Sequence, residues 1–454
     1  MKRTLIGLIL AVALILAALP ASAQLGDVDN SSFTVQNRGS EEATVLIVFY
    51  EEDGTEHVPS PLNLDQPNPF TLHPGSSFEV YVPDIPDLDD GRYSVVISSD
   101  QDIVAVTNMI GEMGTIFYTG SYSGDAPGAD AVFVPSVVYA FYNWNSLISI
   151  QNAGDSATNV TVDYTCADGS TAQHTKADLA PGAAVHFDLE TNPPAGLPVG
   201  CTGSAEVSAT GGTPLIVVDN QSAAGGFTQS YNAFIAGATE LFVPALYHQY
   251  YTWDSSLNIR KIGAGSTTVT VAYSDDTSSE CVLTDASPSC LLYMPDELVG
   301  TGLFAADISS DALPVVAIVN AANPNNQAQT YGAFLGGTET VGVLNETVGL
   351  PTLMNQYFGW DTSFTCQNVG EVATTLSISY QDHEADAYDT AALAAGESIE
   401  VYQPAETFLA EGYRGAAVVT ANAAGAEIAC IVNLTHGANQ AADMGDWSMS
   451  YNAE

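Results

Sequence analysis

The feature that most constrains this chain is a pattern that occurs four times along it. Each copy opens with an apolar–polar–apolar segment, and ten residues after its second apolar position another alternating segment begins. The opening segments are 33–39, 148–154, 257–263 and 364–370, and the second segments are 45–49, 160–164, 269–273 and 376–380. Apolar residues at every second position indicate strands with one buried face. The constant spacing therefore predicts one β-structured unit in four copies.

The later part of each copy adds turns and a closing strand. Turn signals recur at Pro74, Pro181, Pro288 and Ala395. A continuous apolar strand then ends at Asn108, Asn220, Asn320 and Asn433, and a Tyr closes each copy at Tyr122, Tyr231, Tyr331 and Tyr451. Short strands broken by turns, without helical periodicity, are typical of all-β sandwiches. We therefore expect four tandem sandwich domains, at 24–125, 126–236, 237–337 and 338–454.

Three tryptophans mark the period of the repeat. Trp144, Trp253 and Trp360 are separated by 109 and 107 residues, and each follows another aromatic residue at the start of a strand. Large aromatic side chains at equivalent places usually fill a core or a domain junction. The alternative is a ligand platform on which sugar rings stack. Because the linkers between copies are short, we expect a semi-rigid rod.

The N-terminus carries the marks of a secretory signal peptide, residues 1–23. Lys2 and Arg3 precede an apolar stretch, and Ala21 and Ala23 form a small-residue cleavage site. An uncleaved membrane anchor is the alternative, but a spanning helix needs about 20 apolar residues. We expect a cleaved, secreted or cell-surface chain with no transmembrane helix in its mature form.

The chain is strongly acidic because it has few bases. It contains 8 Lys and Arg against 53 Asp and Glu, and only 13% of its residues are charged. A hydrophobic content of 46% is enough for real cores. The negative field argues against nucleic acid and anionic membranes as partners. It favours cations, basic partners or a saline medium.

The six cysteines are distributed two to a copy over the last three copies. Fifteen connectivities are open to six cysteines, but separate folding of each copy favours pairing within copies. An oxidising compartment favours disulfides over free thiols. The expected bridges are Cys166–Cys201, Cys281–Cys290 and Cys366–Cys430.

The order of these motifs resembles the CARDB-type immunoglobulin-like domain, a family named after cell-adhesion-related domains of bacterial surface proteins. The resemblance rests on Gln151-Asn152-x-Gly154, the turn at 179–182 and the strand opening at Gly203. Arg260 and Lys261 replace the Gln-Asn pair in the third copy. The resemblance implies seven-stranded sandwiches on an exported protein and no catalytic residues. It also implies that Cys366–Cys430 pins two sheets together, whereas Cys281–Cys290 only staples a hairpin.

Calcium is the one cofactor that the sequence suggests. Asp84, Asp87, Asp89 and Asp90 precede a Gly in one loop, and Asp382, Glu384, Asp386 and Asp389 form a second group. Hard cations need several oxygen ligands on a flexible turn. Neither group has the EF-hand spacing, so solvated acidic loops are the alternative.

Other chemistry has no sequence support. The seven His residues form no metalloprotease motif, and no nucleophile elbow or phosphate loop is present. We therefore predict a non-enzymatic protein. The leading hypothesis is an exported structural or adhesive cell-surface protein, a component of an envelope layer or extracellular filament that binds an envelope protein, a glycan or itself. The alternative is a secreted module that binds glycans or proteins.

Overall fold

The structure is a computed structural model that describes residues 28–113, 116–124, 128–223, 226–325, 327–336, 344–437 and 446–453. It is an all-β fold with separate antiparallel sheets, as the alternating sequence pattern predicts. The predicted signal peptide lies outside the described residues. No helix in the described part of the chain is long and apolar enough to cross a membrane.

Each of the four sequence repeats contributes a front sheet of four strands in the same order. In the first two repeats these are β5 (Ser77–Tyr81), β1 (Val28–Asn37), β7 (Ile103–Met113) and β8 (Ile116–Ser123), then β13 (Ala184–Asp188), β10 (Trp144–Asn152), β15 (Leu215–Ala223) and β16 (Phe227–Asn232). The last two have β21 (Ser289–Tyr293), β18 (Asp254–Lys261), β23 (Val315–Asn323) and β24 (Gln327–Gly332), then β30 (Ser398–Tyr402), β27 (Trp360–Asn368), β32 (Ile428–His436) and β33 (Ser448–Asn452).

Back strands accompany each front sheet: they form a separate sheet in the first, third and fourth repeats, and in the second repeat they are joined to the front strands in one eight-stranded sheet. Those of the first two repeats are β3 (Glu56–His57), β2 (Ala43–Tyr50), β4 (Phe70–Leu72) and β6 (Ser94–Ser99), then β12 (Thr171–Leu179), β11 (Thr158–Cys166), β14 (Cys201–Ala209) and β9 (Ala131–Phe141). The others are β20 (Ser278–Leu283), β19 (Thr267–Tyr273), β22 (Gly302–Ser310), β17 (Glu240–His248) and β25 (Phe334–Leu335), then β29 (Tyr388–Asp389), β28 (Leu376–Tyr380), β31 (Tyr413–Ala421) and β26 (Thr347–Asn355). Helical segments are short: α1 (Met294–Glu297), η1 (Asn63–Asp65), η2 (Val82–Asp84), η3 (Thr210–Gly212), η4 (Glu384–Asp386) and η5 (Gln403–Ala405).

The core of each repeat lies between its front and back strands. In the first repeat, Val35 of β1 and Ile47 of β2 are fully buried in one apolar cluster. These are the apolar positions of the two alternating sequence segments, so burial of one face explains the period of two. The cores of the second and third repeats merge into a single cluster, whereas the first repeat keeps its own.

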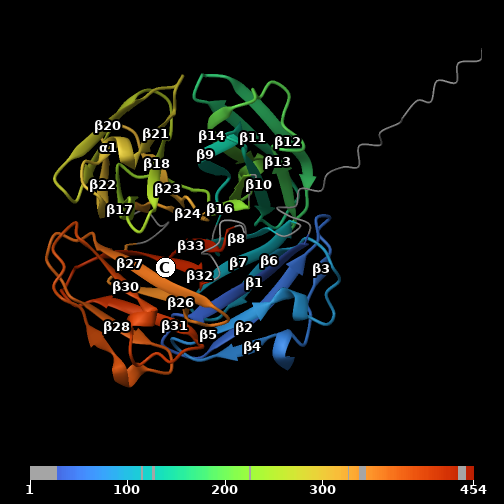
Figure 1. The fold of residues 1–454 in the computed structure, drawn as a ribbon. Helices are drawn as coiled ribbons and strands as arrows, with labels where there is room; N and C mark the ends of the chain where they lie inside the picture. The colour runs from blue at the N-terminus through green and yellow to red at the C-terminus, as the bar shows by residue number, and fades with distance from the viewer. Residues whose placement is uncertain are drawn as a thin grey trace, which may run out of the picture.

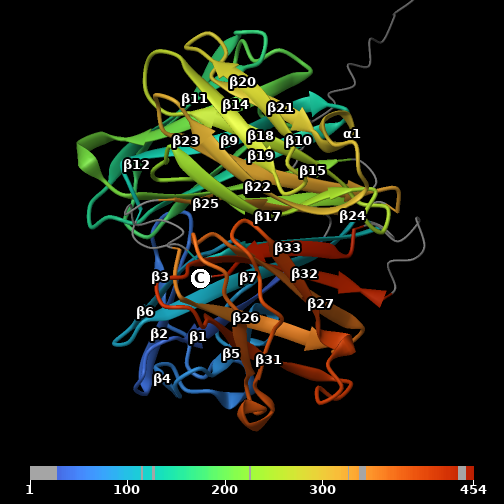
Figure 2. The same cartoon turned by 90° about the vertical axis from the view of Figure 1, so that its left-hand side faces the viewer.

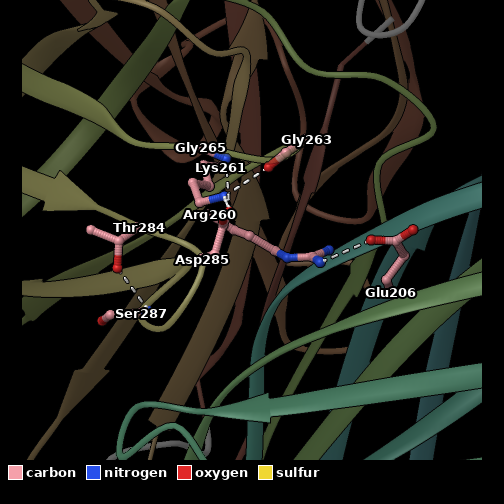
Figure 3. Close-up of polar contacts among 8 residues, drawn as sticks. All are labelled: Glu206, Arg260, Lys261, Gly263, Gly265, Thr284, Asp285 and Ser287. Carbon is pink, nitrogen blue, oxygen red and sulfur yellow. Dashed lines mark hydrogen bonds and ion pairs between the residues drawn. The ribbon is translucent and has the colours of Figure 1, made fainter.

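The Gln-Asn pair of the sequence motif has a structural role. Buried Asn152 donates to the carbonyls of Ser156 and Leu179, both at 2.9 Å, and accepts the N–H of Gly154 at 2.9 Å. Asn37 and Asn368 make the same set of bonds. In the third repeat Lys261 takes this place, and its Nζ donates to the Gly263 carbonyl and to Asp285, both at 2.7 Å (Figure 3). The departure from the motif is therefore compensated within the same turn.

The three predicted disulfides are present, but two of them have exchanged roles. Cys366 and Cys430 lie directly opposite each other on neighbouring strands of one front sheet, with Cα atoms 4.1 Å apart. The expectation that this bridge joins two sheets is wrong. Cys281 belongs to the back sheet through β20 and Cys290 to the front sheet through β21, so their bridge is the one that joins two sheets. Cys166 and Cys201 are on the adjacent strands β11 and β14.

The four repeats form a closed ring, so the expectation of a rod is also wrong. Figure 1 shows one repeat in each quarter of the molecule, with β8, β16 and β33 near the centre. After a quarter turn, the second and third repeats lie above the first and fourth (Figure 2). The first and last repeats are in contact, because Gln36 Nε2 donates to the Ala417 carbonyl at 3.4 Å and Arg414 pairs with Glu79. A rod would leave these repeats far apart.

Neighbouring repeats meet in equivalent ways around the ring. Arg260 of β18 donates to the Ala205 carbonyl at 2.7 Å and to the carboxylate of Glu206 at 3.3 Å (Figure 3). Arg260 corresponds to Gln36 and Ala205 to Ala417, so the same contact recurs at another junction. At the third junction Gln367 donates to Asp307 at 2.9 Å. The front sheet of each of these repeats thus packs on the back strands of the preceding one.

The last strands of the repeats surround the ring axis. The ends of β8, β16, β24 and β33 line a cavity of about 70 Å³. Asp446, which is fully buried, bonds to all four repeats. Its N–H donates to Phe117, and its carboxylate accepts the N–H groups of Thr228, Ala328 and Ser448 at 2.8–3.1 Å. Burial raises the pKa of Asp446 well above its ordinary value, and these N–H donors act in the opposite direction.

Candidate binding surface

Three tight hairpins expose one aromatic side chain each. They join β9 to β10, β17 to β18 and β26 to β27, and their tips carry Tyr142, Tyr251 and Phe358. These side chains are 83%, 80% and 81% exposed, respectively. Because the junction contacts recur around the ring, the equivalent hairpins lie on the same side of it.

The backbone at these tips is unusual for aromatic residues. Both central residues of each hairpin have positive φ, with values of 49°, 47° and 48° at Tyr142, Tyr251 and Phe358. Two-residue hairpin turns of this kind favour Asn and Gly, which tolerate positive φ at little cost. A bulky residue there is rare and invites a functional explanation. Folding alone would favour a different residue at all three tips.

The base of each hairpin is braced by one side chain. Asn145, Asp254 and Asp361 accept the N–H of Ala140, Gln249 and Gln356 at 2.8–2.9 Å. In the fourth repeat the Tyr402 hydroxyl also bonds to Asp361, and burial together with this carboxylate raises the pKa of Tyr402. Tyr293 has the equivalent strand position beside Asp254, which contributes to its raised pKa after burial. An exposed ring, a carboxylate and a phenol thus lie in one region of these repeats.

The tryptophans follow the exposed rings by two positions and are less exposed. Trp360 is buried against Trp447, with ring centroids 6.0 Å apart, while Trp144 and Trp253 are half-buried against Phe227 and Tyr247. These ring contacts lie within each tryptophan's own repeat, so of the two packing positions expected, core or junction, they match the core. The sequence contains a signal for the exposed rings, since an aromatic residue precedes each Trp by two positions. The sequence-based alternative assigns the ligand platform to the Trp side chains, whereas the structure exposes the preceding aromatic residues.

The predicted calcium ligands are solvent-exposed. Asp84 ends η2, and Asp87, Asp89 and Asp90 follow in the loop before β6. In the second group, Asp386 pairs with His383 at 3.3 Å and Asp389 accepts from Asn422 at 3.1 Å. Within the described ranges no three His, Cys, Asp or Glu side chains are grouped to hold a metal ion. Calcium binding stays a prediction that titration must test.

One buried carboxyl group stands out from the exposed acids. Asp219 is fully buried, and it accepts hydrogen bonds from Gln221 at 2.8 Å and from Ser146 at 3.2 Å. Burial raises the pKa of Asp219 to about 7, although these donors act to lower it. The Tyr231 hydroxyl is a third hydrogen-bonding neighbour that also acts to lower this pKa. Asp219 lies in the core of the second repeat, so this geometry supports a structural role.

Comparison with known proteins supplies no relative from which to transfer a function. No family model matches the chain, and no curated protein matches it.

Proposed function

We propose that this chain is a non-catalytic, exported structural or adhesive protein of the cell surface, a component of an envelope layer or extracellular filament. In this proposal, residues 1–23 direct export and the four repeats are immunoglobulin-like domains of the CARDB kind. The observation that carries the proposal is the set of exposed rings at Tyr142, Tyr251 and Phe358. One body that presents three equivalent apolar contacts is suited to binding a repetitive surface.

The arrangement of these rings supports multivalent attachment. Each ring offers only a small contact area, so a single site would bind weakly. Binding at one site raises the effective concentration of the other two, and the combined affinity can exceed each single affinity by about 10²–10⁴. An acidic surface with few bases repels other copies of itself, and a saline or cation-rich medium screens this repulsion. An extracellular setting can provide such a medium.

The test removes the three rings together. The variant Tyr142→Ser, Tyr251→Ser, Phe358→Ser should reduce retention of the protein in the envelope fraction, or its self-assembly, by at least about tenfold. A matched control replaces three exposed aliphatic residues elsewhere: Val199→Ser, Val282→Ser and Val299→Ser. Native protein found free in the culture fluid, without envelope association or self-assembly, would overturn the proposal.

A secreted glycan- or protein-binding module is the second candidate. It is favoured by Asp361 and Tyr402 at the base of the hairpin that exposes Phe358. Aromatic rings stack on the apolar faces of sugars, and carboxylates accept hydrogen bonds from sugar hydroxyls. Asp361→Asn preserves the brace, as Asn145 does in the second repeat, but removes the charge. Loss of glycan-array binding in the double variant Asp254→Asn, Asp361→Asn, at unchanged melting temperature, would favour this candidate.

A further inference from the structure

Within the described residues, the first repeat has no counterpart of a strand that the other three repeats have, and the positions directly before β1 that correspond to it lie outside the described residues. In those repeats a leading strand, β9, β17 or β26, pairs with the edge of β14, β22 or β31. The counterpart of β14, β22 and β31 in the first repeat is β6, which pairs with β2 in the same register as β14 pairs with β11. Within the described residues β6 pairs with β2 alone. No described strand pairs with its other edge, and an edge of this kind can template another strand.

The groups that receive a leading strand are nevertheless present in the first repeat. In the other repeats the closing Tyr donates its hydroxyl to the carbonyl of the residue after the leading strand's Pro. These bonds are Tyr231 to Ser136, Tyr331 to Ala245 and Tyr451 to Thr352. Tyr122 occupies the equivalent position, paired with Thr107 as Tyr231 is with Asp219. Its hydroxyl interacts with the Thr107 side chain, as the Tyr231 hydroxyl does with Asp219, and within the described residues no leading strand offers it a carbonyl.

The front sheet of the second repeat, which faces the edge of β6, is also less buried than its counterparts. Leading strands β9, β17 and β26 contact the front sheet of the following repeat. In the second repeat, which follows β6, Gln151 and Ile216 are half-buried. The residues at their positions in the other three repeats are all buried: Gln36, Arg260 and Gln367, and Val104, Val316 and Ala429. Among the described residues, the front sheet of the second repeat is therefore less buried beside β6 than the other front sheets are beside their leading strands.

The three existing leading strands show what would fill this slot. Their sequences read Val-Phe-Val-Pro-Ser at 132–136, Leu-Phe-Val-Pro-Ala at 241–245 and Val-Gly-Leu-Pro-Thr at 348–352. The shared pattern is apolar, any residue, apolar, Pro and a small residue. In β9 the alternate residues Val132 and Val134 are buried in the core of their repeat.

We propose that β6 accepts an extended strand of this pattern donated by another polypeptide. The donor would bond to the edge of β6 opposite β2, bury its alternate apolar side chains in the first repeat and offer a carbonyl to Tyr122. This is strand addition, in which backbone bonds supply affinity and side-chain pockets supply specificity. The slot rests on the proposed removal of residues 1–23 in export, but it does not involve the exposed hairpin rings, so it can fail or hold independently of their role in adhesion.

The test traps a strand peptide by a disulfide. The probe is a synthetic peptide with the sequence 240–248, in which the residue equivalent to Phe242 is Cys. Phe242 lies opposite Asp307, which corresponds to Val96 of β6 and to Val418 of β31. Val96→Cys provides the partner thiol, and the peptide Cys is supplied as a mixed disulfide with 2-thiopyridine, so that the Val96→Cys thiolate displaces pyridine-2-thione and no oxidant is needed. All six native cysteines are already bonded. Val418→Cys is the matched control, since Val418 is also half-buried but its edge is occupied by β26.

We expect Val96→Cys to form the adduct at least tenfold faster than Val418→Cys, as measured by intact mass. The chain should begin at Gln24, and a scrambled peptide should react slowly with both variants. If Val96→Cys destabilises the fold, exposed Ser98→Cys with the peptide Cys at the place of Glu240 tests the same register. Equal rates in the variant and the control, or no adduct, would overturn the proposal. It would also fail if a chain that retains residues 1–23 blocks the adduct, because the slot would then be filled from within the chain.

Discussion

At the scale of single residues, two of the scarce bases have structural positions. Arg260 and Arg414 each lie at a junction between repeats, and each guanidinium also stacks over an aromatic ring, Phe133 or Tyr357, at 5.2–5.3 Å. Arginine suits such places because its planar group can donate several hydrogen bonds while it stacks. Burial lowers the pKa of both.

Replacing Arg260 separates these contributions. Arg260→Ala should lower the free energy of unfolding by about 2–4 kcal/mol, because it removes the cation–π contact and leaves the Ala205 carbonyl without its donor. Arg260→Gln should cost markedly less, since Gln36 bonds the equivalent carbonyl of Ala417. Urea unfolding measures both, with exposed Lys176→Ala as the control. Equal losses for the Ala and Gln variants would contradict this assignment.

The buried carboxyl of Asp219 should make stability depend on pH. Its pKa of about 7 exceeds the ordinary value near 3.9, so the folded state holds a proton that the unfolded state releases. The contribution of Asp219 to the free energy of unfolding should therefore be fully present below about pH 4, and up to about 4 kcal/mol of it should be lost as the pH rises through 7. Asp219→Asn should remove this part of the slope in urea unfolding. Asp155→Asn, at an exposed site, should leave it in place.

At the scale of elements, the alternating pattern located the strands but not their partners. Cys366 and Cys430 lie on the two strands that we predicted, and both point into the core. Whether two such strands face each other across the core or lie side by side depends on sheet order. The motif spacing contains no information on that order. The same lack explains Cys281–Cys290, where the chain crosses from the back sheet to the front sheet between the two cysteines.

The loss of unfolding free energy on removal of a disulfide should increase with the length of the loop that it closes. Cys366→Ala with Cys430→Ala opens a separation of 64 residues, for which the chain-entropy model gives about 4 kcal/mol. Cys281→Ala with Cys290→Ala opens a separation of 9 residues, which corresponds to about 2.5 kcal/mol. Thermal or urea unfolding under non-reducing conditions should show this order. The reverse order would mean that the link between sheets matters more than the entropy of the unfolded chain.

At the scale of the whole molecule, ring closure distinguishes this protein from a string of domains. A compact chain of about 430 residues has a radius of gyration near 22 Å, and a rod of four modules would be about twice as large. Small-angle scattering should therefore give a value close to 22 Å. A value typical of the rod would contradict the contact between the first and fourth repeats.

Asp446 should be the most sensitive single position for this closure. Asp446→Ala leaves three buried N–H groups without an acceptor, at a cost of about 1–3 kcal/mol each. We expect a loss of at least about 3 kcal/mol in unfolding free energy and an increased radius of gyration. Exposed Asp130→Ala serves as the control. A variant that stays compact and as stable as the native chain would show that Asp446 does not hold the ring.

The sequence by itself determined the period, the strands, the turn residues and the cysteine pairs, because these depend on local patterning and on burial of one strand face. It could not decide the order of strands in a sheet, the closure of the ring or the exposure of Tyr142, Tyr251 and Phe358. Those features arise from contacts between residues hundreds of positions apart, such as Gln36 with Ala417. The pattern of four copies is thus local, whereas the surface that carries the three exposed rings exists only once the repeats have assembled.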